Sequence, residues 1–144
     1  MKRKANANWQ GTGLEGTGSL TTKSGVFKEQ PYSFKTRFKN DDGTLGTNPE
    51  ELIAAAHAGC FTMAMSFMLD RAGFTATNLD TEAVVHMEKN DAGFKISLID
   101  LTIKGEVPGI DKDTFQDLAE KAKVGCPISQ ALQTIEMKLT ATLV

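Results

Sequence analysis

The feature that most constrains the fold is an uncharged stretch of 18 residues, Leu52 to Leu69 (LIAAAHAGCFTMAMSFML). Its length is at the short limit for a helix that spans a membrane. It contains polar residues such as His57 and Thr62, and it follows directly on two glutamates. We therefore interpret it as the buried central helix of a soluble protein, with no membrane partner. A helix that is apolar on nearly every side must be covered on nearly every side, so we expect a second subunit to cover part of it.

The residues around this stretch predict where the helix begins and ends. Asn48 can cap it, and Pro49 suits the first helical position. The two glutamates that follow suit the positive end of the helix dipole. We expect the helix to run to about Ala72, because Gly73 is well placed to end it.

The rest of the chain changes between strand and helix patterns. We expect strands and turns over residues 5–38, a hairpin over 82–106, two helices after Asp111 and a strand over 135–143. This order predicts an α+β fold, with a mainly antiparallel sheet packed on the long central helix. A chain of 144 residues suits a single domain over 1–144.

Two local patterns make more specific predictions. Residues 32–37 alternate between two kinds of side chain, which predicts a strand that carries Arg37. In the strand over 94–106, the apolar positions are even-numbered up to Leu98 and odd-numbered from Ile99. A slip of one residue predicts a β-bulge. Residues 40–46 (NDDGTLG) are expected to form a polar loop.

Charge and cysteine content exclude several classes of protein. The chain has 16 Lys and Arg residues against 18 Asp and Glu residues, so it lacks the basic excess of a nucleic-acid-binding protein. Two cysteines exclude a disulfide-rich scaffold. No apolar stretch follows the basic first residues, so we expect no secretion signal and a cytoplasmic location. In a reducing compartment, a cysteine pair more often serves chemistry or metal binding than structure.

Cys60 lies in the middle of the predicted central helix. Burial raises the pKa of a thiol unless a cation offsets it, so a reactive Cys60 needs a positive partner; the alternative is a small buried apolar residue. Arg37 is the best candidate, because Arg3 lies near the start of the chain and Arg71 at a helix end. A buried arginine needs a carboxylate. Glu50 lies about 80° around the helix axis and about 15 Å along it from Cys60, so only a bridging group such as an arginine could connect them.

The second cysteine and the histidines leave alternatives open. Cys126 precedes Pro127 and is expected to be a helix N-cap, where free N–H groups favour a thiolate; a cap without redox function is the alternative. His57 shares a helix face with Cys60, although a lone histidine is more often a surface or packing residue. A zinc site is a further alternative, made of His57, His86, Cys60 and Cys126. The chain has no CxxC, no glycine-rich phosphate loop and no HExxH motif.

Several segments together resemble the OsmC/Ohr family. Residues 47–61 (TNPEELIAAAHAGCF) are similar to its signature helix, and residues 122–129 (AKVGCPIS) to its second cysteine segment. Residues 25–38 (GVFKEQPYSFKTRF) and 107–111 (VPGID) resemble the OsmC branch more than the Ohr branch. The resemblance covers nearly the whole chain. It implies an intertwined homodimer with two active sites at the subunit interface.

The resemblance also implies an activity and a set of site residues. The family are thiol-dependent peroxidases that reduce organic hydroperoxides to alcohols, and hydrogen peroxide less well. Cys60 is implied to be the peroxidatic cysteine and Cys126 the resolving one, joined in a disulfide during turnover. Arg37 and Glu50 are implied to be the activating pair, and His57 is given no role. An external dithiol of lipoyl type would restore the thiols, and neither a metal nor a bound cofactor is implied.

Two further expectations accompany this interpretation. The apolar walls for the alkyl chain of a substrate are expected to be Phe34, Phe38, Phe61 and Met63. The alternative function from another class is a non-catalytic, stress-induced binding or structural protein of the same fold, with its cysteines merely buried.

Overall fold

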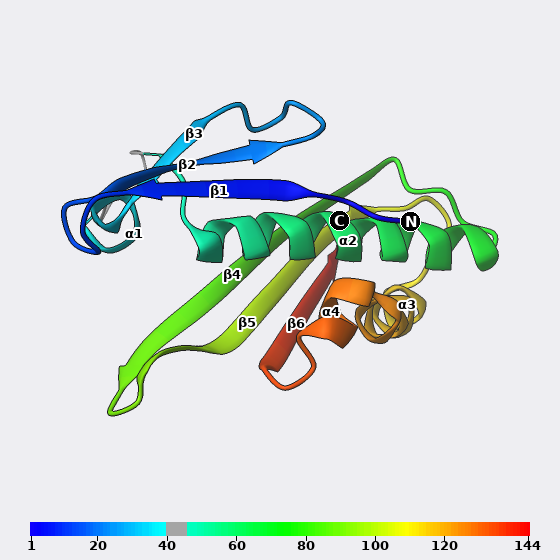
Figure 1. The fold of residues 1–144 in the computed structure, drawn as a ribbon. Helices are drawn as coiled ribbons and strands as arrows, with labels where there is room; N and C mark the ends of the chain where they lie inside the picture. The colour runs from blue at the N-terminus through cyan, green and yellow to red at the C-terminus, as the bar shows by residue number, and fades with distance from the viewer. Residues whose placement is uncertain (40–45) are drawn as a thin grey trace. The chain divides into compact units, whose positions relative to one another are not determined.

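The computed structural model describes residues 1–39 and 46–144, so the polar loop predicted for 40–46 lies almost entirely outside the described residues. The chain divides into two compact units, Met1–Leu52 and Ile53–Val144. The elements follow one another along the chain in the order shown in Figure 1: β1 (Ala5–Gln10), β2 (Thr17–Thr22), β3 (Gln30–Ser33), α1 (Phe34–Phe38), α2 (Pro49–Arg71), β4 (Asn78–Asn90), β5 (Gly93–Glu106), α3 (Lys112–Gly125), α4 (Pro127–Ala131) and β6 (Glu136–Leu143).

The first unit is built on a three-stranded antiparallel sheet with the order β1-β2-β3. Trp9 of β1 and Tyr32 of β3 approach each other across the middle strand, with ring centroids 5.4 Å apart. A Cβ atom on Gly18 of β2 would lie 2.6 Å from the Tyr32 ring and 2.9 Å from the Trp9 ring. The middle strand therefore needs a residue without a side chain where the two rings pack.

Residues 34–38 form the helix α1, so the predicted strand over 32–37 is wrong from Phe34 onward. Ser33 begins the helix with a capping box: its hydroxyl accepts from the Thr36 N–H at 3.1 Å, and the Thr36 hydroxyl accepts from the Ser33 N–H at 2.9 Å. These two bonds satisfy free donors at the helix start, and they override the weak alternation of side chains. Arg37 consequently lies on a helix.

The predicted bounds of the central helix are confirmed. Asn48 caps α2, because its side-chain oxygen accepts from the Glu51 N–H at 2.8 Å. The helix begins at Pro49 and ends at Arg71, and Gly73 has the left-handed φ of +84° that a glycine adopts without strain. α2 begins in the first unit and continues into the second.

Burial along α2 follows one stripe. Four residues at intervals of four are buried, namely His57, Phe61, Met65 and Leu69. Met63 and Phe67 lie off this stripe and are 62% and 58% exposed. By length and composition alone α2 could cross a membrane, a test that the core helices of soluble proteins also pass. The described residues of the second unit therefore leave apolar side chains of this helix exposed.

The second unit contains a three-stranded sheet with the order β4-β5-β6. The hairpin β4–β5 is antiparallel and its strands are longer than the predicted ones, whereas β6 pairs with β5 in parallel. The predicted bulge is present: His86 lies opposite Leu98 and Met87 opposite Ile96, so Ser97 is the extra residue on β5. The bulge turns the apolar side chains on both sides of it toward the same face.

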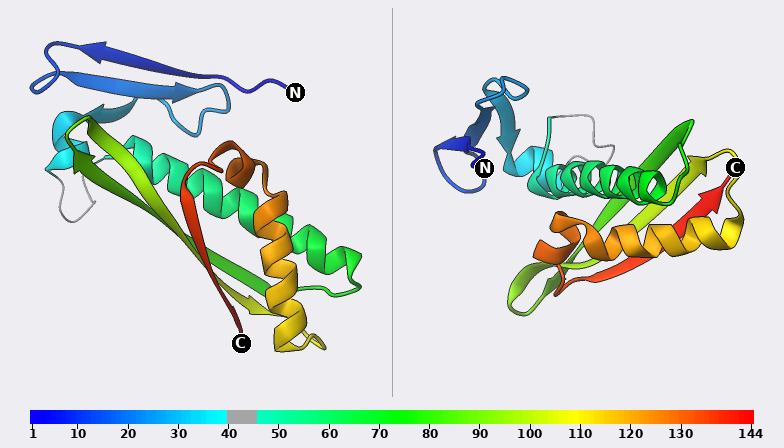
Figure 2. Two further views of the ribbon diagram at one scale, coloured as in Figure 1. Left: turned by 90° about the horizontal axis from the view of Figure 1, so that it is seen from below. Right: turned by 90° about the vertical axis from the view of Figure 1, so that its right-hand side faces the viewer.

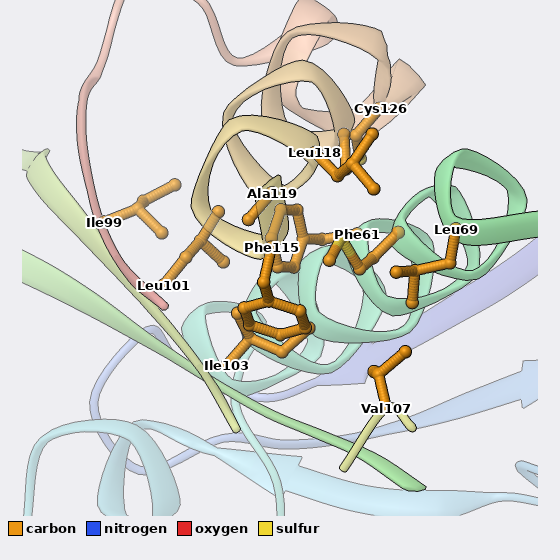
Figure 3. Packing of buried hydrophobic residues seen from close by; sticks show 12 residues of the cluster. Phe61, Leu69, Ile99, Leu101, Ile103, Val107, Phe115, Leu118, Ala119 and Cys126 are labelled. Carbon is orange, nitrogen blue, oxygen red and sulfur yellow. The ribbon is translucent and has the colours of Figure 1, made fainter. Parts of the chain in front are cut away.

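Buried side chains of α2, β5 and α3 form the core of the second unit (Figure 3). α3 begins at the predicted cap Asp111, whose carboxylate accepts from the Thr114 N–H at 2.9 Å. Its predicted apolar face is buried, and it consists of Phe115, Leu118, Ala119 and Ala122. Both views of Figure 2 show α3 lying alongside β6. Cys126, which follows α3, belongs to the same core.

Gly105 of β5 offers a test of this packing. A Cβ atom there would lie 2.4 Å from the Phe115 ring, so Gly105→Ala should destabilise the protein by about 1–3 kcal/mol through overpacking. The measurement is the midpoint of urea unfolding. Gly13→Ala is the control, because no atom lies within 4 Å of a Cβ atom at that position. Equal midpoints for the two variants would contradict the packing described for Gly105.

Candidate active site

The two cysteines lie side by side although 66 residues separate them in the sequence. Cys60 comes from the middle of α2, and Cys126 from the junction between α3 and α4. Their Sγ atoms are 2.9 Å apart in a hydrogen bond, and both thiols are free. A disulfide bond is about 2.05 Å long, so the sulfur atoms need to approach by only about 0.9 Å to join. Cys126 is fully buried and Cys60 is half-buried.

The surroundings of the two thiols shift their pKa values in opposite directions. Burial raises the pKa of Cys60, and the hydrogen bond with Cys126 raises it further, against a smaller opposite effect of the Ile128 N–H. Burial also acts to raise the pKa of Cys126, but hydrogen bonds from Cys60 and from Ser129 outweigh it and hold this pKa below its usual value. In the second unit by itself, Cys126 is therefore the thiol that ionises first, and the proton left on Cys60 stabilises it.

Cys126 is the N-cap of α4, as predicted. Its sulfur makes no regular capping hydrogen bond, yet the N–H groups of Ser129 and Ile128 still favour its thiolate. Ser129 is the third residue of α4, and its side chain acts on the Cys126 sulfur as well. Ser129 was not among the residues predicted from the sequence, although the position three residues after a cap is the one whose N–H normally meets the capping side chain.

Arg37 and Glu50 form a two-pronged ion pair within the first unit. Nε of Arg37 donates to Oε2 of Glu50 at 3.1 Å, and Nη2 of Arg37 donates to Oε1 of Glu50 at 2.6 Å. The Glu50 side chain is only 14% exposed, and the guanidinium carbon lies 4.9 Å from the centroid of the Phe38 ring. Two parallel hydrogen bonds fix the plane of the guanidinium, which a single contact could not do.

The structure thus brings the four predicted residues together as two pairs, Arg37 with Glu50 in one unit and Cys60 with Cys126 in the other. Phe34 and Phe38 pack against each other on α1, with ring centroids 4.8 Å apart, and Met63 is exposed. Phe61 is fully buried in the core, so its predicted role as a wall for substrate is wrong. Phe61 lies on the buried stripe of α2 and therefore does not face the surface.

The histidines are placed apart from each other. Nε2 of His57 lies 2.8 Å from the Ser129 hydroxyl, and Nε2 of His86 lies 2.7 Å from a carboxylate oxygen of Asp100. Within residues 1–39 and 46–144, no three His, Cys, Asp or Glu side chains gather as metal ligands would. The zinc alternative therefore finds no cluster of ligands in this part of the chain.

Two free thiols in hydrogen-bond contact can interconvert with a disulfide, which is the chemistry of thiol-based redox proteins. The chain belongs to the OsmC-like protein family, whose model matches residues 40–140. It is 53% identical to peroxiredoxin OsmC of Escherichia coli over 133 residues, which cover 92% of this chain and 91% of the relative. This similarity, together with 29% identity to the organic hydroperoxide resistance protein OhrB of Bacillus subtilis over 85% of this chain and 87% of that protein, supports a peroxidase-type enzyme.

Solved structures agree with this assignment. An organic hydroperoxide resistance protein from Elizabethkingia anophelis superposes with a TM-score of 0.76 at 27% identity, covering 100% of this chain and 99% of that one. OhrB of Bacillus subtilis superposes with a TM-score of 0.72 at 25% identity, covering 98% of each chain. The predicted α+β fold class and the predicted family are confirmed.

The sulfur geometry predicts that mild oxidation joins Cys60 to Cys126. Treatment with a small thiol oxidant should lower the mass of the chain by two hydrogen atoms, and peptide mapping should recover one crosslinked pair. The reaction is expected to be fast because the sulfur atoms are already in contact. Cys126→Ser is the control, which should show no such loss. A wild-type chain that yields only intermolecular disulfides would contradict the geometry.

Proposed function

We propose that this protein reduces organic hydroperoxides to alcohols, and hydrogen peroxide more slowly, through a sulfenic acid on Cys60 and a Cys60–Cys126 disulfide. The observation that carries the proposal is the 2.9 Å separation of the two sulfur atoms. The sulfenic acid on Cys60 forms next to the Cys126 thiol. Disulfide formation therefore needs only a very short approach of the sulfur atoms, and it competes with further oxidation of Cys60.

The proposed cycle has three steps. The Cys60 thiolate attacks the distal peroxide oxygen, the O–O bond breaks, and the leaving alkoxide takes up a proton and departs as the alcohol. The Cys126 thiolate then attacks the sulfur of the Cys60 sulfenic acid, and the hydroxide that leaves takes up a proton and departs as water. An external dithiol, of lipoyl type by family resemblance, finally supplies two electrons and returns both thiols.

The first step requires an ionised Cys60, which the second unit alone disfavours because burial and Cys126 raise the pKa of this thiol. We propose that the Arg37 guanidinium, held in orientation by Glu50, faces Cys60 in the working enzyme. A positive charge beside a thiol favours the thiolate and lowers its pKa. Phe34 and Phe38 lie on the same helix as Arg37, and they would favour alkyl peroxides by burying the alkyl chain.

The proposed assembly is a homodimer. Met63 and Phe67 expose large apolar side chains on α2, and covering such side chains with a second copy removes them from water. Two thiols that must be reduced again after each turnover fit a reducing compartment, and we propose the cytoplasm.

Substitution of each cysteine separates the first two steps. Cys60→Ser should abolish the consumption of cumene hydroperoxide, because it removes the attacking sulfur. Without added reductant, Cys126→Ser should consume one equivalent and stop as a sulfenic acid, which mass spectrometry detects after trapping with a carbon nucleophile. Wild type should stop as the disulfide. Full activity in Cys60→Ser would refute the assignment, and a wild-type chain without peroxide consumption would favour the non-catalytic alternative.

Replacement of Arg37 tests the source of the activating charge. Arg37→Met should raise the pKa of Cys60, so the rate of Cys60 oxidation, which follows the thiolate fraction, should fall several-fold at neutral pH and recover at alkaline pH. The measurement is the second-order rate with cumene hydroperoxide as a function of pH. Arg71→Met, at the exposed end of α2, is the control. A pH profile identical to that of wild type would remove Arg37 from the site.

A further inference from the structure

His57 is a buried titratable side chain for which the proposed mechanism has no use. It belongs to the buried stripe of α2 and is 0% exposed. Its Nε2 atom lies 2.8 Å from the hydroxyl oxygen of Ser129, whereas its Nδ1 atom is buried and has no hydrogen-bond partner among the described residues. The surrounding residues therefore hold the imidazole in place, with Ser129 as its hydrogen-bond partner.

The environment of the ring selects one tautomer. A neutral imidazole carries a hydrogen on one nitrogen only, and a buried N–H without an acceptor is costlier than a buried nitrogen lone pair without a donor. The hydrogen therefore belongs on Nε2, where the Ser129 oxygen accepts it, and Nδ1 keeps the lone pair. Because Nε2 donates, the hydroxyl hydrogen of Ser129 is free to be donated elsewhere.

The Cys126 sulfur is the candidate acceptor for that hydrogen. Ser129 lies three residues after Cys126, as the third residue of the helix that Cys126 caps, and its side chain favours the Cys126 thiolate. The 2.8 Å contact of His57 with Ser129, and the place of Ser129 three residues after Cys126, allow a directed chain of donors, from the imidazole N–H to the serine oxygen and from the serine O–H to the sulfur. A donor that is itself polarised by a second donor makes a stronger hydrogen bond.

We propose that neutral His57 is a positioning residue that acts through Ser129 to present Cys126 as the thiolate that resolves the sulfenic acid on Cys60. The proposal rests on the function proposed above, since it concerns the second step of that cycle. In that step, the Cys126 thiolate forms the S–S bond, the S–O bond of Cys60 breaks, and hydroxide leaves and takes up a proton as water. The oxidising equivalents come from the hydroperoxide.

The charges near the chain of donors are compatible with this role. Burial lowers the pKa of His57, so the ring is neutral at physiological pH and the donor chain carries no net charge. The titratable group that acts on Cys126 from α2 is Cys60, and α4 contributes the N–H groups of Ser129 and Ile128 and the Ser129 hydroxyl. His57→Leu should therefore raise the pKa of Cys126 without removing a charge from the site.

Single-turnover kinetics test the proposal. The enzyme is mixed with cumene hydroperoxide without reductant, and sulfenic acid and disulfide are followed by rapid quenching and mass spectrometry. His57→Leu should slow disulfide formation several-fold at neutral pH, because the Ser129 hydroxyl loses the donor that polarises it, without slowing the oxidation of Cys60. His57→Gln, whose amide can still donate to Ser129, should restore most of the rate. His86→Leu is the control, with its histidine on the surface pair with Asp100.

Two further variants distinguish loss of the donor chain from a folding defect caused by His57→Leu. Ser129→Ala deletes the hydroxyl without opening a large cavity, and it should slow disulfide formation at least as much as His57→Leu. Because His57 acts through that hydroxyl, the double variant His57→Leu/Ser129→Ala should be no slower than Ser129→Ala alone. Additive losses in the double variant would contradict the proposed chain.

A readout without peroxide separates this proposal from the function on which it rests. In a Cys60→Ser background, the ultraviolet absorbance of the remaining thiolate reports the pKa of Cys126 directly. Adding His57→Leu should raise this pKa, and His57→Gln should largely restore it. A wild-type chain that consumes no hydroperoxide would refute the proposed function, whereas a Cys126 pKa and a resolution rate that ignore both His57 and Ser129 would refute the chain of donors.

Discussion

The packing of α2 against α3 in the second unit holds the two sulfur atoms together, and the proposed chemistry depends on it. Phe61 from α2 and Phe115 from α3 are both fully buried in this core, and Cys126 is part of the same cluster. A well-packed interior transmits small displacements instead of absorbing them. The dithiol is thus held by the same side chains that hold the unit together.

The two thiols differ in their neighbours as well as in their burial. Cys126 has the free N–H groups at the start of α4 and a serine hydroxyl nearby, whereas burial and Cys126 itself disfavour ionisation of Cys60. In the proposed cycle this asymmetry assigns different tasks. Cys60 depends on an arginine for its ionisation and attacks the peroxide. Cys126 is ionised with the help of its own neighbours and attacks the oxidised Cys60. Each sulfur thus has its own source of electrostatic support, and the hydrogen bond between the two sulfur atoms couples their pKa values.

Local signals allowed much of the fold to be predicted from the sequence. Three of these signals concern neighbouring residues only, and each produced the expected structure. They are the helix cap Asn48, the helix-ending Gly73 and the shift in the apolar pattern near Ser97. The helix α1 was missed because its capping box uses a threonine, Thr36, where glutamate or glutamine is typical. The contact of His57 with Ser129 joins residues 72 positions apart, and no local pattern encodes such a contact. The parallel pairing of β6 with β5 likewise depends on the path of the chain through α3 and α4.

The spacing of the buried residues along α2 has a geometric consequence. Steps of four residues exceed one helical turn of 3.6, so the line from His57 to Leu69 winds around the axis by about 40° a step and about 120° in all. A helix or strand packed parallel to α2 would lose contact with this line of buried residues within two turns. Only elements that cross α2 obliquely can stay in contact with it. The uncovered strip winds with the same pitch, so whatever shields it from water must also lie across the helix at a slant.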